Sequence, residues 1–172
     1  RSMFSRFNAD YMPKLEKLNV NAFRFGISWP RVQPSEGQFD ENALETYANW
    51  AKDLAVNNIS VYITLIHFDI PEWWETKYGG LAMPNEKHEE GIRCFKSYVL
   101  RVLQKFQELG VWSLMKERAM LPVFITLNEP FLHCLHAYML GRRPPYKHSF
   151  NKFSQSIKNC ALLHIAAFDV IH

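Results

Sequence analysis

Residues 122–130, PVFITLNEP, are the stretch from which the fold can be argued. The apolar run VFITL follows a proline and ends at the NEP turn, a pattern typical of a short buried β-strand. Two similar runs precede it along the chain, residues 22–29 (AFRFGISW) and residues 60–67 (SVYITLIH). The sequence therefore predicts three short strands.

Longer segments with helical periodicity separate these strands. Apolar side chains recur every three or four residues in the ranges 41–56, 86–109 and 153–171, and a shorter helix is predicted near residues 8–18. Asp40, directly before the first of the long helices, is the expected N-cap. Strands that alternate with helices of this length indicate βαβ units and a parallel α/β sheet.

Two architectures have this alternation, the doubly wound open sheet and the (β/α)8 barrel. The first carries glycine-rich phosphate loops, and neither G-x-G-x-x-G nor G-x-x-x-x-G-K-[ST] occurs here. No linker or low-complexity tract interrupts the chain, so one domain or part of one is expected. The chain begins at Arg1 and ends at His172 in an apolar-periodic segment without a capping residue, so we expect a piece of a longer protein.

Composition and charge exclude several classes of protein. Of the 172 residues, 48% are hydrophobic and 22% are charged, which is typical of a globular protein and unlike a disordered chain. Lys and Arg number 20 and Asp and Glu 17, so the net charge of +3 gives no reason to expect nucleic acid as a partner. No apolar stretch reaches the length of a membrane span, and no signal peptide is recognised.

Cysteine and histidine residues give no sign of a metal centre. The three cysteines, Cys94, Cys134 and Cys160, fit a reducing compartment or buried thiols better than a disulfide framework. His133, Cys134 and His136 lie close in sequence but lack a fourth ligand at the usual spacing. We therefore expect no bound metal.

Polar residues gather where the three predicted strands end. The first strand ends at Ser28, the second is followed by His67 and Asp69, and the third by Asn128 and Glu129. In a parallel barrel, the C-terminal ends of the strands and the loops after them build the active site. Three polar strand ends in succession therefore predict a site at this edge of the sheet.

Glu129 is the strongest candidate for chemistry. Its carboxylate follows an apolar strand at the expected barrel rim, where lost solvation favours the protonated form. Pro130 disfavours helical geometry at the residue before it, so Glu129 is expected to be extended. A carboxyl of this kind can donate a proton to a leaving oxygen. The alternative is a carboxylate at a helix start beside a proline turn, without a catalytic role.

Arg24 and His67 each allow two interpretations. Alternation places Arg24 on the strand face opposite Phe23 and Phe25, which in a barrel is the interior, where a guanidinium needs a carboxylate partner. The alternative is an edge-strand arginine that reaches solvent. His67 is either a hydrogen-bond donor to a substrate or, as the residues alone favour, a satisfied imidazole in the core.

Four aromatic residues lie near the ends of the first two strands. They are Trp29, Trp73, Trp74 and Tyr78. Together they are candidates for an aromatic platform under sugar rings, although a core role is the default for any one of them.

Four sequence blocks occur in a recognisable order. They are FRFGISWPRVQP (residues 23–34), TLIHFDIPEW (residues 64–73), YGG (residues 78–80) and TLNEP (residues 126–130). These blocks resemble the successive motifs of family 1 glycoside hydrolases, the β-glucosidase and β-galactosidase type of enzyme. The tail NCALLHIAAFDVIH resembles the helix after the family's fourth strand. The T-x-N-E-P block is specific, and the similarity runs over nearly the whole chain.

The resemblance implies a (β/α)8 TIM barrel and retaining hydrolysis of β-linked glycosides, with a small carbohydrate or glycoside as substrate and no cofactor. It implies that Glu129 is the general acid/base and that Asn128 binds the sugar 2-hydroxyl. It further implies that His67 is a sugar-binding histidine and that Arg24 pairs with the nucleophilic glutamate.

The chain also departs from the family pattern. Phe68 stands where a tryptophan normally follows the histidine, Leu81 stands where one follows the Gly-Gly pair, and residues 110–121 form a longer link than usual. The family's first strand would precede this chain and its nucleophile would follow it. Residues 1–172 are therefore expected to be a single partial barrel domain, truncated at both ends, with strands two to four of eight.

Two other functions remain open at this point. One is a transglycosylase on the same scaffold, in which a sugar hydroxyl replaces water, and the other is an inactive carbohydrate-binding remnant. Three strands cannot close a barrel, which needs eight. The chain alone is therefore expected to lack turnover and to self-associate through apolar sheet edges at residues 23–27 and 123–127.

Overall fold

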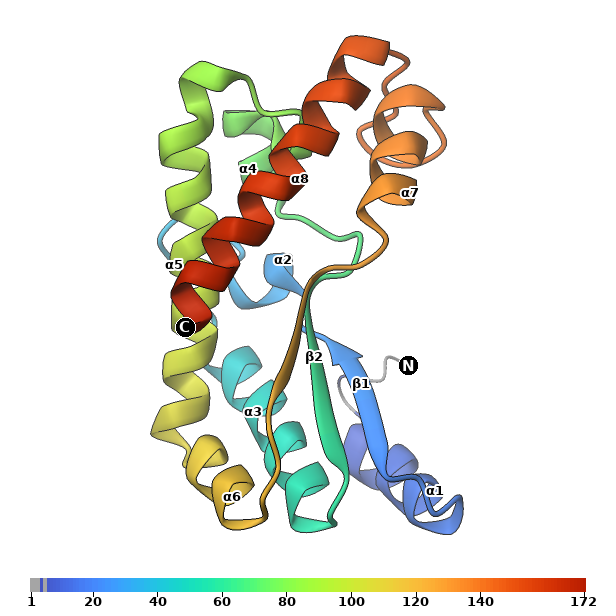
Figure 1. Ribbon diagram of the computed structural model, residues 1–172, viewed down its shortest axis with the longest axis vertical. Helices are drawn as coiled ribbons and strands as arrows, with labels where there is room; N and C mark the ends of the chain where they lie inside the picture. The colour runs from blue at the N-terminus through green and yellow to red at the C-terminus, as the bar shows by residue number, and fades with distance from the viewer. Residues whose placement is uncertain (1–3, 5) are drawn as a thin grey trace.

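The sheet of the computed structural model, which describes residue 4 and residues 6–172, consists of three parallel strands (Figure 1). They are β1 (Ala22–Gly26), β2 (Ser60–Ile66) and β3 (Val123–Leu127), hydrogen-bonded in the order β1-β2-β3. Phe25 pairs with Ile63 and Ile63 with Phe124, so the three strands are in matched register. The predicted parallel sheet is confirmed.

Helices connect the strands and follow the last of them. They are α1 (Met12–Lys17), α2 (Trp29–Val32), α3 (Glu41–Val56), α4 (Glu72–Tyr78), α5 (His88–Glu108), α6 (Val111–Glu117), α7 (Pro130–Cys134) and α8 (Phe150–Ile171), with short turns of π-helix at Phe7–Tyr11 and Leu135–Met139 and of 3₁₀-helix at Gly80–Ala82 and Asn85–Lys87. The four predicted helices correspond to α1 with the π-helical turn before it, α3, α5 and α8. The shorter helices α2, α4, α6 and α7 have too few residues for a helical period to show in the sequence.

Local sequence sets the start of α3 as predicted. The Asp40 side chain accepts a hydrogen bond of 2.9 Å from the backbone nitrogen of Ala43 and so caps the helix. Within the described part of the chain, none of the helices combines the length and the apolarity that crossing a membrane requires.

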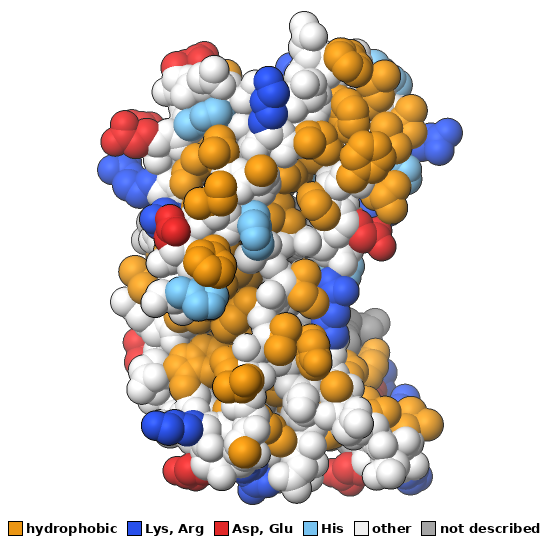
Figure 2. All heavy atoms as spheres, in the orientation of Figure 1, with side chains coloured by type: hydrophobic (Ala, Val, Ile, Leu, Met, Phe, Trp, Pro, Cys, Tyr) orange, Lys and Arg blue, Asp and Glu red, His pale blue; other side chains and the backbone are white. Residues whose placement is uncertain are grey.

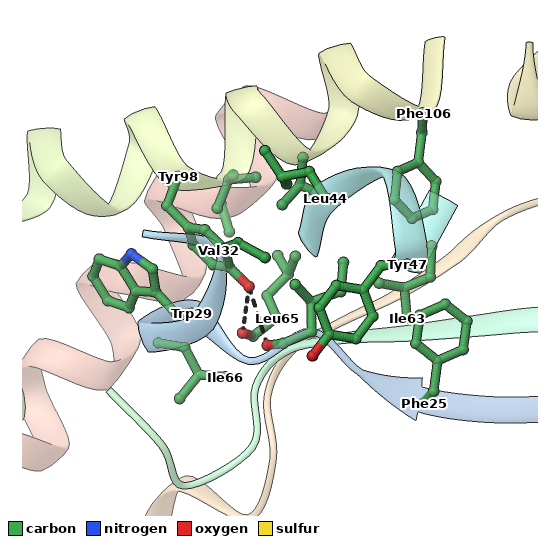
Figure 3. Packing of buried hydrophobic residues seen from close by; sticks show 14 of the residues in the cluster. Phe25, Trp29, Val32, Leu44, Tyr47, Ile63, Leu65, Ile66, Tyr98 and Phe106 are labelled. Carbon is green, nitrogen blue, oxygen red and sulfur yellow. Dashed lines mark hydrogen bonds between the residues drawn. The ribbon is translucent and has the colours of Figure 1, made fainter. Parts of the chain in front are cut away.

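The helices α3 and α5 lie on one side of the sheet, and α8 packs against α5 and β3 (Figure 1). Phe25 and Ile63 are buried toward this helical layer, in contact with the apolar stripes of the two helices (Figure 3). Residues one position away on the strands point to the other face, where Arg24, Tyr62 and Val123 are exposed. One face of the sheet is thus the core and the other carries the candidate site residue Arg24.

Tyr98 of α5 fixes this helix at the C-terminal ends of two strands. Its fully buried hydroxyl group donates to the carbonyl oxygen of Leu65 at 2.9 Å and lies 3.3 Å from that of Ile27 (Figure 3). Burial raises the pKa of Tyr98 well above its usual value, so the hydroxyl stays protonated and remains a donor. The ring of Trp29 stacks on the Tyr98 ring with centroids 5.0 Å apart. The C-terminal ends of β1 and β2 therefore pack on a buried aromatic core.

Candidate active site

Arg24, in the middle of β1, connects this strand with β2 and with the residue that follows β3. Its Nε donates to Thr64 Oγ1 of β2 at 2.8 Å, and its Nη2 donates to Asn128 Oδ1, directly after β3, at 2.5 Å. Arg24 therefore lies on the sheet face away from the helices, where alternation places it. Among the described residues it forms no ion pair with a carboxylate, so the expected carboxylate partner is not in this part of the molecule.

Asn128 is held from two directions. Its backbone nitrogen donates to the carbonyl oxygen of Ile66 at 2.8 Å, which continues the sheet pairing one residue beyond β3. Its side-chain oxygen accepts from Arg24, and the residue is only 9% exposed. An asparagine amide has one acceptor oxygen and two N–H donors. Because Arg24 occupies the oxygen, the N–H bonds are the part of the amide that is oriented for a ligand.

Glu129 has left-handed backbone geometry, with φ 42° and ψ 55°, and it is the N-cap residue of α7. The expectation that Pro130 keeps it extended is therefore wrong. The chain turns from β3 into a helix that begins at Pro130 within a single residue, and this turn overrides the preference of the residue before a proline. Such geometry at a non-glycine residue costs on the order of 1–3 kcal/mol, and strained residues of this kind are enriched at functional sites. Glu129 is also exposed, so the expected burial at a barrel rim is absent in the described part of the chain.

His67 is exposed at the end of β2, so its interpretation as a core imidazole is wrong. Gly26 of β1, which has no side chain, leaves space for the imidazole of His67. A Cβ atom at Gly26 would be 3.3 Å from the Cβ of His67, which is tighter than most real contacts. The next residue, Phe68, has a positive φ of 72° and turns the chain away, with its ring edge-on to the imidazole at 5.1 Å. Two of the three strand ends thus carry a non-glycine residue with positive φ.

A pocket of about 700 Å³ opens beside His67. It is lined by His67, Phe68, Asp69, Ile70, Glu72, Glu75, Thr76, His133, Tyr138, Arg143, Pro144 and Pro145. This volume is in the range of small-molecule sites. Neither Asn128 nor Glu129 lines it, so the pocket extends the site from His67 in the direction of α4 and α7.

Burial shifts the pKa values of two groups that line this pocket. Burial raises the pKa of Glu75, and a hydrogen bond of 2.9 Å from the Tyr138 hydroxyl group opposes that shift. Burial and the nearby charge of Arg143 lower the pKa of His133 to about 4, so this imidazole is neutral at pH 7. The guanidinium of Arg143 lies over the Phe68 ring at 4.5 Å from its centroid.

Three of the four aromatic residues near the strand ends belong to the core. Trp29, Trp74 and Tyr78 are at most 2% exposed, so for them the platform interpretation is wrong. Trp73 is half-buried, and its indole nitrogen donates to the backbone oxygen of Gln33 at 3.0 Å. The phenyl and phenol rings that line the pocket are instead those of Phe68 and Tyr138.

His133, Cys134 and His136 do not converge on a common point. His133 lines the pocket, whereas the Cys134 sulfur lies 3.5 Å from that of Cys160. No group of three or more His, Cys, Asp or Glu residues suited to a metal ion occurs in the part of the chain that the structure describes.

Sequence reasoning missed two residues that shape this site. Thr64 anchors Arg24, and the signal for it was the shared face that alternation gives the two residues on neighbouring strands. Arg143 reaches the Phe68 ring from a loop that follows α7. No periodic pattern places a loop residue, so nothing in the sequence pointed to this contact.

Comparison with known proteins connects this geometry to a family. The chain matches the model of glycosyl hydrolase family 1 over residues 2–172. A non-cyanogenic beta-glucosidase from Trifolium repens is 31% identical over 133 residues, which cover 74% of this chain and 23% of that protein. An oleuropein beta-glucosidase from Olea europaea is 29% identical over 154 residues, 87% of this chain and 25% of that protein. The chain spans about a quarter of the length of these curated relatives.

Solved structures agree in fold. A beta-glycosidase from Pyrococcus horikoshii superposes with a TM-score of 0.82 at 26% identity, covering 99% of this chain and 36% of that one. A beta-glucosidase from Thermotoga maritima in complex with castanospermine gives the same TM-score and identity, with coverages of 98% and 34%. The expected partial (β/α)8 TIM barrel is thereby confirmed, and the chain belongs to glycosyl hydrolase family 1.

Proposed function

We propose that the protein to which these residues belong hydrolyses β-linked glycosides with retention of configuration at the anomeric carbon. In this proposal Glu129 is the general acid/base, Asn128 binds the sugar 2-hydroxyl and His67 binds another hydroxyl of the same sugar. Arg24 lies beside the nucleophilic carboxylate. The chain would contribute three strands of a single barrel domain.

The contact that carries the proposal is the hydrogen bond from Arg24 to Asn128. It fixes the amide with its N–H donors free to meet a hydroxyl group, and the same chain segment continues into Glu129. The left-handed backbone of Glu129 then sets the direction of the carboxyl relative to that amide. Consecutive residues can thus do two things at one glycosidic bond. Asn128 would hold the sugar in place while Glu129 protonates the leaving oxygen.

The chemistry takes two steps and two carboxylates, which are about 5–5.5 Å apart in retaining enzymes. In the first step Glu129 protonates the glycosidic oxygen while the nucleophile attacks the anomeric carbon. In the second, Glu129 accepts a proton from water, which displaces the sugar from the nucleophile. Arg24 has no carboxylate partner among the described residues. We therefore propose that the nucleophilic carboxylate lies outside residues 1–172 and forms an ion pair with the Arg24 guanidinium.

The test is to follow hydrolysis of nitrophenyl β-glucoside by NMR, with the longest natural polypeptide that contains this chain. We expect the β-anomer of the sugar to appear first, and no turnover of the matched nitrophenyl α-glucoside. If the α-anomer appears first, the retaining mechanism is wrong. Transfer of most of the sugar to an added sugar acceptor would favour the transglycosylase, and binding without turnover would favour the inactive remnant.

The 172-residue chain alone gives a second expected result. The two-step mechanism needs a nucleophilic carboxylate in addition to Glu129. Because none pairs with Arg24 among the described residues, we expect no hydrolysis of nitrophenyl β-glucoside. We further propose that the isolated chain self-associates, because apolar side chains gather over α7 and α8 (Figure 2), among them Phe131, Ile165 and Phe168, which are each more than half exposed. Sedimentation velocity would detect species larger than 20.2 kDa. Hydrolysis by the isolated chain would contradict the first expectation, and a strictly monomeric chain would contradict the second.

A further inference from the structure

Two buried thiols face each other between α7 and α8. Cys134 is the last residue of α7 and Cys160 lies in the middle of α8, and their sulfur atoms are 3.5 Å apart. Both are free cysteines, 0% and 5% exposed, and 26 positions separate them in sequence. The third cysteine, Cys94, is partly exposed and contacts Glu36 instead.

One member of the pair borders a pocket. A mostly apolar pocket of about 430 Å³ lies between the end of β3 and α8, and Cys160 lines it while Cys134 does not. Phe131, Ile157 and Ala161 are among its other lining residues. A small aromatic or apolar reagent that enters this pocket would therefore meet Cys160 before Cys134.

The environment also prepares the second thiol for reaction. The contact between the two thiols, in which either sulfur can donate, lowers the pKa of Cys134, whereas the same contact and burial raise the pKa of Cys160. The thiolate is the form of cysteine that attacks sulfur. Cys134 is therefore placed to attack the Cys160 sulfur once that sulfur carries a mixed disulfide.

We propose that Cys134 and Cys160 form a dithiol site that exchanges with low-molecular-weight disulfides and closes into a reversible disulfide between α7 and α8. The proposal does not depend on glycosidase activity. The sulfur atoms need to approach by about 1.5 Å to reach the roughly 2.05 Å of a disulfide bond. Side-chain rotation together with a small shift of the five-residue α7 can supply that movement.

The exchange takes two steps. The Cys160 sulfur, once its proton has passed to the Cys134 thiolate beside it, attacks the reagent RSSR, forms a mixed disulfide Cys160–S–SR and expels RS⁻, which takes that proton from Cys134. The Cys134 thiolate then attacks the Cys160 sulfur and expels the second RS⁻. In total two cysteine thiols are oxidised to one disulfide, RSSR is reduced to two RSH, and the two thiol protons end on the released thiols. Excess thiol reverses both steps.

The crosslink would act on the segment next to Glu129. Because α7 begins directly after Glu129 and ends at Cys134, a bond to Cys160 ties that short helix to the long helix α8. Closing a loop of 26 residues removes conformational freedom from the unfolded chain. Oxidation would therefore stabilise the fold around the candidate acid/base.

The probe is 2,2′-dithiodipyridine, which releases one coloured pyridine-2-thione for each thiolate attack. It is added to the Cys94→Ser variant of the chain, so that only the pair can react. We expect two equivalents of thione, no pyridyl group retained in the mass of the protein, and a linked Cys134–Cys160 peptide after unreduced proteolysis. We also expect the oxidised chain to melt on the order of 5–10 °C higher than the reduced chain.

Two further variants separate a site from mere reactivity. In the Cys94→Ser background, Cys134→Ser leaves Cys160 able to attack but not to resolve, so we expect one thione and a retained pyridyl group. Cys160→Ser is expected to react far more slowly, because Cys134 does not line the pocket. A retained pyridyl group in the chain that has both cysteines, or no thione at all, would overturn the proposal. So would a crosslink that joins two chains instead of the two helices.

Discussion

Replacing Glu129 with glutamine is expected to lower kcat/KM for a glycoside with an alkyl or sugar leaving group by about 10²–10⁴-fold, the usual contribution of a general acid/base. The glutamine side chain would keep the size of the original and the backbone turn, but it could not give a proton to the departing oxygen. The measurement is hydrolysis by the longest natural polypeptide that contains the chain, since the role proposed for Glu129 requires a nucleophile as well.

The leaving group makes this test specific for acid catalysis. A dinitrophenolate departs without protonation, so the first step with dinitrophenyl β-glucoside should be far less affected by Glu129→Gln than the first step with an alkyl glucoside. Glu45→Gln, on the exposed face of α3, is the matched control and should leave both rates unchanged. Equal losses for the two leaving groups, or an unaffected Glu129→Gln variant, would contradict the acid/base assignment.

The second large effect concerns pH and His133. This imidazole is 5% exposed, and its pKa is lowered from 6.5 to about 4 by burial and by the charge of Arg143. Below pH 6.5 the imidazole takes up a proton in the unfolded chain but not in the folded chain. The contribution of His133 to the free energy of unfolding is therefore complete above pH 6.5 and is lost as the pH falls toward 4. A shift of this size corresponds to at most about 3 kcal/mol.

Other charges face the same pocket and set the size of this effect. Asp69, Glu72 and Glu75 line it with His133, and ionised carboxylates there would favour a charged imidazole. Burial raises the pKa of Glu75, so the folded chain takes up a proton there before the unfolded chain does, and this contribution opposes the loss at His133 as the pH falls. The net expectation is a fall in Tm between pH 6.5 and 4 to which His133 contributes.

The measurement is Tm against pH, at one protein concentration, for the chain and for His133→Gln. We expect the variant to lose less stability than the parent over this range. His148→Gln removes an exposed histidine and should follow the parent curve. NMR titration of the imidazole gives an independent result, because a His133 resonance that titrates near pH 6.5 would show that burial does not hold the ring neutral.

Much of the fold could be predicted because its signals are local. The β-branched run before Asn128, the N-cap at Asp40 and the long apolar stripes of α3, α5 and α8 are each set by neighbours along the chain. The parallel order of the strands followed from the helices between them. Short helices such as α2 and α7 could not be predicted, since their few residues form mainly through tertiary contacts.

The candidate site divides in the same way. The motifs identified Glu129, Asn128, His67 and Arg24 as a group. The order of polar strand ends placed His67, Asn128 and Glu129 at one edge of the sheet, and alternation placed Arg24 on the strand face opposite Phe23 and Phe25. The roles assigned to them remain proposals. The residue pair Cys134 and Cys160 was noted only as two separate thiols, because no sequence pattern shows which side chains two helices bring together.

By itself, the sequence determined the alternation of strands and helices, the parallel sheet and the edge at which polar residues collect. These properties follow from the periodicity of apolar residues and from the direction of the chain, and both can be recognised from short stretches of sequence. Only the tertiary structure decided that Glu129 is left-handed rather than extended, that Arg24 binds Thr64 and Asn128, and that His133 is buried beside Arg143. Those features arise where separate segments meet, and the geometry of such a meeting is fixed by packing and not by the propensity of any one residue.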